Sequence, residues 1–346
     1  MQVGEINGIE DLEALRLEWS RLWERCPHAT IFQTPEWLLP WCRNLFGGGS
    51  LWSLAVWRDG RLAALAPMFI WGGERKCISM TGAGVTDYLD FLCEPDVAAP
   101  AVQMILGRLG QREDNWRVCV LDDLPPESPL LARGAIPESL AWRRESCANC
   151  PVLDLPATVE ELYRRLPHKF QVDLRRAKNR LARAGKLEVE LAGEPTLPWC
   201  LASLFELHQA RWQARSQTGM LASGALQAFH REAAAGFLRR GALRLWVLRL
   251  NGAAAAVLYA FARWPRLYIY LGGFEPSLSR LSPGTVLMSL AIEQAICERF
   301  QQLDFLRNPE SFKRLWGARD RWSQRLVIRR SGAAAGGVGA GVADAA

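Results

Sequence analysis

Residues 266–285 read RLYIYLGGFEPSLSRLSPGT, and this stretch decides the fold of the second half of the chain. The apolar and aromatic run from Arg266 to Gly272 predicts a strand, and the residues as far as Leu281 predict a loop. Ser282 is a good N-cap, and the proline after it is suited to a first helical position. The stretch therefore predicts a strand, a loop and the start of an apolar helix that runs from Gly284 to Phe300.

The start of this helix is a predicted binding site for a phosphate or pyrophosphate. The backbone N–H groups of Gly284, Thr285 and Val286 are expected to be free at the positive end of the helix dipole. Gly284 has no Cβ, which permits the close approach of a ligand. The Ser282 side chain can compete for the same N–H groups, so an efficient helix start without a ligand is the alternative.

A second strand, Leu303–Leu306, is expected to follow the helix. Two neighbouring strands that splay apart leave backbone groups free for an extended ligand, so Tyr270 and Leu271 are predicted ligand contacts. A reaction at this site that removes a proton from a substrate also needs a group to accept it. Asp304 on the second strand and His208 on the preceding helix are the predicted proton acceptors. The alternatives are that Asp304 caps the following turn or pairs with Arg307, and that His208 is structural or solvated.

Two β-hairpins indicate that one α/β unit occurs twice. Leu51–Phe69 and Leu243–Phe261 each contain two apolar runs, joined at Asp59-Gly60 and at Asn251-Gly252, which are strong hairpin signals. A helix precedes each hairpin and a strand, a helix and a further strand follow it. The later elements are expected at 99–109 and 117–121 in the first half.

The expected domains are residues 1–150 and 151–330, with an extended crossover near 148–160. Residues 331–346 are rich in glycine and alanine and are expected to be disordered. The first half is expected to be degenerate in donor binding, because its equivalent helix begins near Pro100 without a glycine. The helix after the crossover carries a concentrated positive charge, which indicates either a solvated face or a surface for CoA phosphates, a nucleotide-linked sugar or tRNA. Its basic residues are Arg164, Arg165, Lys169, Arg175, Arg176, Lys178, Arg180, Arg183 and Lys186.

Composition is that of a globular protein, since 49% of the 346 residues are hydrophobic and 23% are charged. The early tryptophans are expected to pack in the core rather than stack on carbohydrate. A formal charge of +6 does not by itself indicate a nucleic-acid partner. The apolar stretch 62–71 is too short to span a bilayer and predicts a buried strand, and with no signal-peptide pattern we expect a cytoplasmic protein. The nine cysteines include one CxxC, Cys147 and Cys150, which lacks the second half of a zinc site, so no metal is expected.

Several short motifs, in order over about residues 10–330, resemble the FemAB-like proteins of the GNAT superfamily, of the CelD type associated with exopolysaccharide or cellulose biosynthesis. They are Phe32-Gln33-Thr34-Pro35-Glu36-Trp37, Gly84-Val85-Thr86-Asp87-Tyr88-Leu89-Asp90, Leu207-His208-Gln209-Ala210-Arg211-Trp212, Gly272-Gly273-Phe274, Leu281-Ser282-Pro283-Gly284-Thr285, Asp304-Phe305-Leu306-Arg307, and Lys313 with Trp316-Gly317. The resemblance implies two tandem GNAT-like α/β domains, each with a mixed, mainly antiparallel sheet flanked by helices.

The resemblance also implies an acyltransferase that moves an acyl group from acetyl-CoA or another acyl-CoA to an amine or hydroxyl of a sugar or amino-sugar intermediate. Expected substrate contacts are Asp87, Tyr88, Arg211, Trp212, Arg307 and Lys313, the last two as anion clamps. The usual Gln/Arg-x-x-Gly-x-Gly/Ala pyrophosphate loop is absent, and related FemAB-type enzymes take aminoacyl-tRNA. Aminoacyl transfer from tRNA, and a non-catalytic scaffold associated with polysaccharide-synthesis proteins, are therefore the alternatives.

Overall fold

The computed structural model describes residues 1–330 except 74–75, 113–115, 214–218 and 308–309, so the expected disordered tail lies outside the described residues. Contacts divide the described chain into two units, residues 1–148 with 322–330, and residues 149–321. In the described chain, no helix has both the length and the apolar character needed to cross a bilayer.

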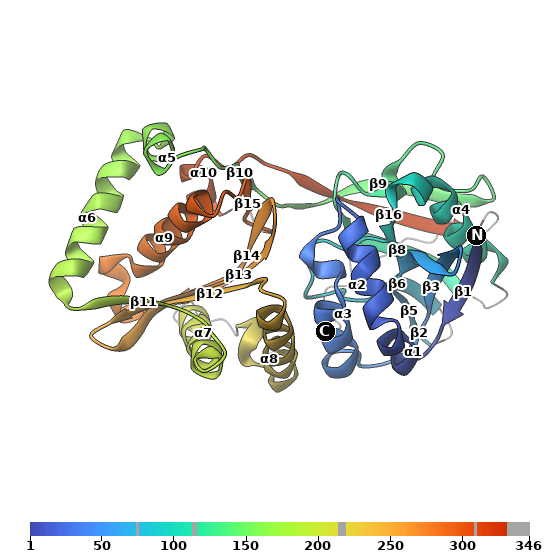
Figure 1. The fold of residues 1–346 in the computed structure, drawn as a ribbon, viewed down its shortest axis with the longest axis horizontal. Helices are drawn as coiled ribbons and strands as arrows, with labels where there is room; N and C mark the ends of the chain where they lie inside the picture. Colours follow the sequence, from blue (N-terminus) through green and yellow to red (C-terminus); the bar gives the residue numbers. More distant parts are fainter. Residues whose placement is uncertain (74–75, 113–115, 214–218, 308–309, 331–346) are drawn as a thin grey trace. The chain divides into compact units, whose positions relative to one another are not determined.

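The first unit contains two sheets and several helices (Figure 1). One sheet has the order β1-β3-β4-β7 and the other β2-β5-β6-β8-β16-β9. The elements are β1 (Gln2–Ile6), α1 (Ile9–Ala14), α2 (Arg16–Arg25), η1 (Ile31–Gln33), α3 (Pro35–Asn44), β2 (Ser50–Leu51), β3 (Ser53–Arg58), β4 (Arg61–Ala66), β5 (Met68–Trp71), β6 (Lys76–Met80), β7 (Leu92–Cys93), η2 (Pro95–Val97), α4 (Ala98–Gln111), β8 (Trp116–Leu124), η3 (Pro129–Leu131), β9 (Leu140–Asn149) and β16 (Trp322–Arg330).

The apolar stretch 62–71, expected as one buried strand, is divided between the two sheets. β4 ends at Ala66 and β5 begins at Met68, so the break falls at Pro67, which has no N–H for a strand ladder. The prediction that early tryptophans pack in the core is confirmed for Trp19, Trp37 and Trp52, which are at most 1% exposed. Their indole N–H groups donate to Gln33, Thr86 and Glu5 respectively, so burial leaves these N–H groups satisfied.

The second unit is built on one sheet with the order β10-β15-β14-β13-β12-β11. Neighbouring strands are antiparallel except β14 and β15, which run parallel. The elements are β10 (Val152–Asp154), α5 (Val159–Arg165), α6 (His168–Ala184), β11 (Leu187–Leu191), α7 (Leu197–Gln213), η4 (Met220–Ala222), α8 (Gly224–Arg239), β12 (Leu243–Leu250), β13 (Ala253–Arg263), β14 (Arg266–Phe274), η5 (Pro276–Leu281), α9 (Pro283–Cys297), β15 (Gln302–Asp304) and α10 (Ser311–Leu315).

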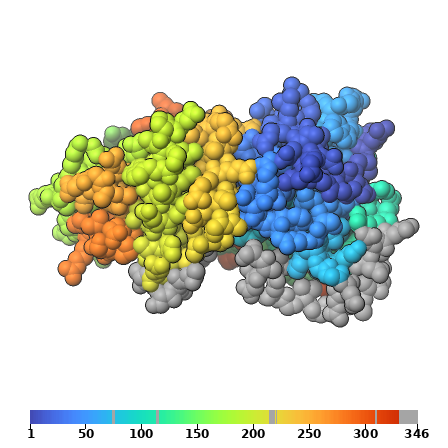
Figure 2. All heavy atoms as spheres, turned by 90° about the horizontal axis from the view of Figure 1, so that it is seen from below, coloured from blue at the N-terminus to red at the C-terminus, as the bar shows by residue number. Residues whose placement is uncertain are grey.

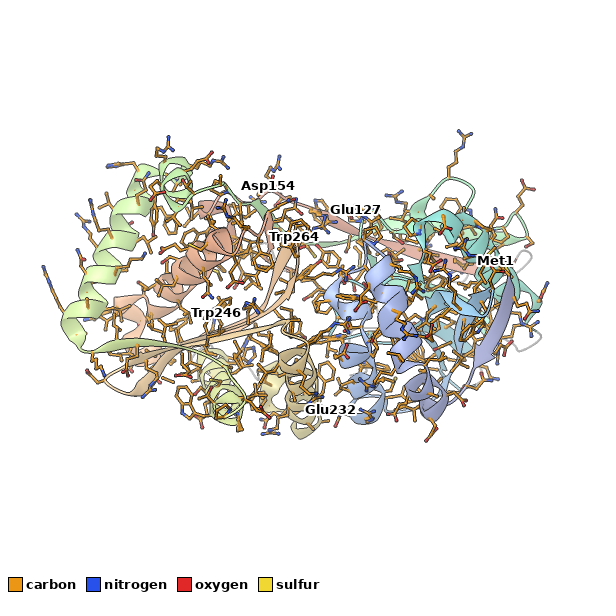
Figure 3. All side chains as sticks on the ribbon, viewed as in Figure 1. Met1, Glu127, Asp154, Glu232, Trp246 and Trp264 are labelled. Atoms are coloured by element: carbon orange, nitrogen blue, oxygen red, sulfur yellow. The ribbon has the colours of Figure 1, made fainter. Side chains whose placement is uncertain are left out.

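Helices cover both faces of this sheet. On one face, alternate residues of β12, β13 and β14 pack in a core cluster with α5, α6 and α9. Trp246 of β12, labelled in Figure 3, lies on this face, where its indole N–H donates to Gln294 of α9 at 3.0 Å. On the other face lie α7 and α8 (Figure 1), which form part of the surface of this unit in the view of Figure 2.

The repeat expected from the two hairpins is confirmed in detail. β3 and β4 turn at Asp59-Gly60 and β12 and β13 turn at Asn251-Gly252, with positive φ at all four residues, as a two-residue hairpin loop requires. Each hairpin also has a register irregularity at the same place, between Val56 and Trp57 and between Leu248 and Arg249. Each unit further contains one parallel pair, β6 with β8 and β14 with β15.

Two boundaries differ from the sequence-based expectation. Residues 151–330 were predicted to form one domain, but β16 lies in the first unit, between β8 and β9. No strand was expected after Leu306, and local residue patterns do not indicate a pairing with the distant strands β8 and β9, which explains the difference. The single basic helix expected after the crossover is two helices, because α5 ends at Arg165 and α6 begins only after Pro167.

Candidate functional site

The parallel strands β14 and β15 separate soon after they begin. They pair only through Arg266, Leu267 and Tyr268, whereas β14 stays paired with β13 as far as Phe274. β15 ends because the Asp304 carboxylate accepts the N–H of Leu306 at 2.8 Å, and Leu306 has a φ of 54° that turns the chain away. In the described chain, the edge of β14 beyond Tyr268 therefore has no strand beside it and is available to an extended ligand.

The turn after β15 is held from two sides. Lys313, only 4% exposed, donates its ammonium protons to the carbonyls of Phe305 at 2.9 Å and of Arg307 at 2.8 Å. Asp304 is fully buried, with Arg321 at 3.6 Å from its second carboxylate oxygen. Lys313 was expected to be an anion clamp, and in the structure its ammonium group is buried and donates to these backbone carbonyls. The capping alternative for Asp304 is observed, and its carboxylate also forms an ion pair with Arg321.

A β-bulge lies on β14 where the strands separate. Tyr259 of β13 faces Leu271, but the next residue, Ala260, faces Ile269, so Tyr270 is the extra residue. A bulge bends the strand and redirects side chains, and bulges are frequent beside active sites. The Tyr270 ring contacts those of Tyr259 and His230, with centroids at 5.9 and 5.6 Å. The predicted donor contacts Tyr270 and Leu271 thus lie at the point of separation.

The start of α9 has open backbone donors. Ser282 has a φ of 55°, and its side chain makes no capping hydrogen bond, so it does not compete for the helix N–H groups. Its carbonyl accepts the N–H of Val286 at 3.2 Å, so the expectation that this N–H is free is wrong. The amides of Gly284 and Thr285 have no intrahelical acceptor and no hydrogen bond to any other described residue. The predicted phosphate site is therefore reduced to these two N–H groups.

The glycine at 273 allows α7 to pack directly on β14. A Cβ added to Gly273 would lie 2.6 Å from the backbone nitrogen of His208 and 2.6 Å from the carbonyl carbon of Leu207. No side chain fits in that space without displacement of the helix. Gly273 therefore places His208 against the part of β14 that lies beyond the bulge.

Two α7 side chains next to His208 complete this side of the site. Arg211 donates to the carbonyl of Gly272 at 3.5 Å and to the Glu310 carboxylate at 3.0 Å. Trp212 donates its indole N–H to Nε2 of His208 at 3.0 Å. The structure thus brings together Arg211, Trp212 and His208 of α7 beside β14.

His208 is neutral at physiological pH. Its ring is 3% exposed, and burial, together with the nearby Arg211 charge, lowers its pKa to about 4. The neighbouring His230 is fully buried, which lowers its pKa to about 3. Since an indole N–H can only donate, Nε2 of His208 is the acceptor of the Trp212 bond and its proton is on Nδ1. Whether this histidine accepts a proton in catalysis stays a prediction.

Sequence reasoning missed Glu310 and Gly219. Glu310 carried no recognisable signal, because its role depends on the distant Arg211. A Cβ on Gly219 would lie 3.2 Å from Nδ1 of His208, a proximity that no local pattern encodes. Among the described residues, no cluster of three His, Cys, Asp or Glu side chains is able to hold a metal ion.

The remaining predicted site residues, Asp87 and Tyr88, lie in the first unit. Tyr88 is 1% exposed, and its carbonyl accepts a hydrogen bond from Gln33 at 2.8 Å. Asp87 is half-buried in the same loop. Their predicted contact with substrate stays a prediction.

Residues 168–314 match the protein-family model described as "Acetyltransferase (GNAT) domain". Most of the second unit is therefore similar to a GNAT-type domain. The match lies wholly within residues 149–321, and the first unit repeats the hairpin and parallel pair of this domain. The expected fold class, two tandem GNAT-like α/β domains, is thus confirmed.

Solved structures resemble nearly the whole chain in fold at low sequence identity. FemX is similar with a TM-score of 0.65 and 11% identity, over 94% of this chain and 97% of that one. L-PGS from Bacillus licheniformis has a TM-score of 0.59 and 14% identity, over 96% of this chain and 95% of that one. The C-terminal domain of a putative lysylphosphatidylglycerol synthetase from Agrobacterium fabrum has a TM-score of 0.54 and 15% identity, over 91% of this chain and 92% of that one. No curated protein sequence matches the chain.

Proposed function

We propose that the second unit transfers an acyl group from acyl-CoA to an amine or hydroxyl group. One observation carries this proposal: the unpaired edge of β14 leads, through η5, to the two open amides at the start of α9. An extended arm bound along a strand edge, with its phosphates at a helix N-terminus, is the geometry that a CoA thioester needs. The positive end of the α9 dipole adds to the attraction.

In this reaction the acceptor nitrogen or oxygen attacks the thioester carbon. The new C–N or C–O bond forms, the C–S bond breaks, and sulfur leaves as the CoA thiol with a proton. Backbone N–H groups of β14 beside the bulge are placed to stabilise the carbonyl oxygen as it gains charge. Asp304 and His208 are the residues predicted to accept the proton, but Asp304 is bound to the turn after β15.

Glu310 is a better-placed proton acceptor. One of its carboxylate oxygens is bound by Arg211, and the other makes no hydrogen bond within the described residues. Arg211 links this carboxylate to the Gly272 carbonyl of β14, so the free oxygen lies near the strand that would bind the donor. The acceptor class, a sugar or amino-sugar intermediate of polysaccharide biosynthesis, is supported only by the resemblance to CelD-type proteins.

Thermal unfolding with acetyl-CoA tests donor binding. A ligand at about 100 times its Kd stabilises the native state by about 2.7 kcal/mol, so the wild-type melting temperature is expected to rise. Gly284→Val is expected to abolish that rise while leaving the unliganded protein folded, because a Cβ at Gly284 meets Phe274 at an ordinary 3.5 Å.

The matched control is Gly224→Val at the start of α8, where a Cβ has open space around it. This variant should keep the acetyl-CoA shift. Normal acetyl-CoA binding by Gly284→Val would remove the proposed phosphate site.

Aminoacyl-tRNA as donor is the second candidate, and the surface of α6 favours it. Exposed basic residues lie on the solvent side of α5 and α6, and in Figure 3 many side chains projecting from α6 end in nitrogen. Among the described residues no ion pair is found for Arg164, Lys169, Arg175, Arg180 and Arg183. α6 also packs against η5, which precedes the start of α9. A polyanionic donor would therefore find positive charge beside the predicted phosphate site.

Salt dependence separates the two donors. tRNA binding should weaken steeply with salt, by about one power of ten in affinity per tenfold salt for each phosphate contact. Arg180→Glu with Arg183→Glu should weaken tRNA binding and leave the acetyl-CoA shift unchanged. If neither acetyl-CoA nor aminoacyl-tRNA shifts the melting temperature, the scaffold alternative is favoured.

A further inference from the structure

The ring of His208 has one polar atom that the protein does not satisfy. Nε2 accepts the indole N–H of Trp212, but Nδ1 is buried and has no hydrogen-bond partner within the described residues. A buried N–H without an acceptor costs free energy, so such a group in a native protein calls for an explanation. None of the described residues supplies the acceptor atom that this N–H needs.

Gly219 lies directly beside Nδ1 of His208. A Cβ added to Gly219 would lie 3.2 Å from Nδ1 of His208 and 3.1 Å from Cδ1 of Trp212. Because residue 219 is glycine, no side chain from this position packs against the imidazole N–H.

Chemistry restricts the occupant to a hydrogen-bond acceptor. Trp212 fixes the ring as the tautomer with its proton on Nδ1, so this atom only donates. The positive charge of Arg211, three residues along the same helix, favours an oxygen with partial negative charge. An alkyl group at this position would leave the N–H unsatisfied.

The face of the sheet indicates which substrate supplies the oxygen. α9, whose first amides are the proposed donor-phosphate site, packs on one face with the residues of the core cluster. His208 lies on α7, which covers the opposite face and contacts β14 at Gly273. A group bound at His208 thus approaches β14 from the side away from α9.

We propose that His208 is a hydrogen-bond donor for an oxygen atom of the acceptor substrate, with Trp212 as the positioning residue that fixes its tautomer. The acceptor is accordingly an amine or alcohol with a second oxygen close to its reacting group. The proton on Nδ1 stays there throughout the transfer, so another group accepts the proton of the nucleophile. This inference rests on the proposed acyl transfer.

The tautomer is tested directly by long-range ¹H–¹⁵N spectra of the full-length protein labelled with ¹⁵N-histidine. The His208 signals, assigned by their loss in His208→Asn, should show a protonated Nδ1 and no titration between about pH 6 and pH 8. Trp212→Phe should populate the second tautomer. A wild-type His208 with its proton on Nε2, or one that titrates in this range, overturns the proposal.

Substrate recognition is tested with acetyl-CoA and two probe amines, glucosamine, which carries hydroxyl groups, and propylamine, which has no oxygen. His208→Ala should raise KM for glucosamine about tenfold, the effect of one hydrogen bond, and leave KM for propylamine unchanged. In His208→Asn the amide N–H replaces the Nδ1–H, so KM for glucosamine should stay within about threefold of wild type. Gly219→Ala, which places a methyl group 3.2 Å from Nδ1, should behave as His208→Ala does.

Equal losses with both amines, or a His208→Asn variant as impaired as His208→Ala, would refute donation to a substrate oxygen. Failure of the proposed function would look different. In that case acetyl-CoA gives neither a thermal shift nor transfer to either amine in the wild type, and the histidine spectra alone then decide whether Nδ1 is the fixed donor.

Discussion

Replacement of Gly273 by alanine tests whether close packing of α7 on β14 shapes the site. The added Cβ would lie 2.6 Å from two backbone atoms of α7, which must retreat by about 0.8 Å to reach the 3.4 Å of ordinary contact. Backbone within a helix cannot yield as the end of a flexible side chain does. Overpacking of this kind costs about 2 kcal/mol, a fall of roughly 4–8 °C in the melting temperature of a unit of this size.

The assay is thermal unfolding without ligand, together with turnover of acetyl-CoA. Gly272→Ala is the matched control, since its Cβ would meet the nearest backbone atom, the Val257 carbonyl oxygen, at 3.3 Å. We expect this control to melt within about 2 °C of wild type, because alanine also lowers the entropy of the unfolded chain. Turnover should fall more in Gly273→Ala, because the His208 backbone moves with α7. Equal melting temperatures for the two variants would refute the reasoning.

Further predictions concern buried charge and turns. Lys313→Met should destabilise the protein by about 3 kcal/mol in urea unfolding, because buried carbonyls after β15 lose their donor. Arg314→Met, on the exposed side of the same helix, should change the free energy of unfolding little. Similar losses of stability in the two variants would contradict the buried role of Lys313. Burial raises the pKa of Asp90 from 3.8 to about 8. Between these two pH values the Asp90 carboxyl is protonated in the folded chain and ionised in the unfolded chain, so the free energy of unfolding falls as pH rises through this window. Asp90→Asn should remove the contribution of Asp90 to this fall. If the variant shows the same dependence of stability on pH as the wild type, the buried carboxyl is not its cause. Asn251→Ala should lower the free energy of unfolding by about 1–2 kcal/mol more than Asp59→Ala does, because the Asn251 side chain also forms hydrogen bonds with the backbone of Ala184 and Lys186. Equal losses for the two variants in denaturant unfolding would argue against those bonds.

Local patterns predicted the parts of the fold that depend on neighbouring residues. The Asn251-Gly252 turn and the helix start at Pro283 follow from conformational preferences of single residues, so the sequence alone was enough to place them. The break at Pro167 was also visible in the sequence, and the prediction of one continuous helix overlooked it.

The site was predicted less completely, because its contacts join distant parts of the chain. The α7 motif correctly placed His208, Arg211 and Trp212 together, since they share one helix. The partner of Arg211 is Glu310, however, and nothing in the residues around either one indicates the other. Lys313 resembled a surface lysine, and only the turn after β15 shows that its charge is buried.

The position of β16 has a consequence for biosynthesis. This strand completes the first unit, yet it follows the entire second unit in the chain. During translation, the edges of β8 and β9 that pair with β16 therefore stay unpaired until residues 322–330 have left the ribosome. Unpaired strand edges favour association with other chains, so the nascent first unit is expected to need protection, by a chaperone or by rapid completion, throughout translation of the second.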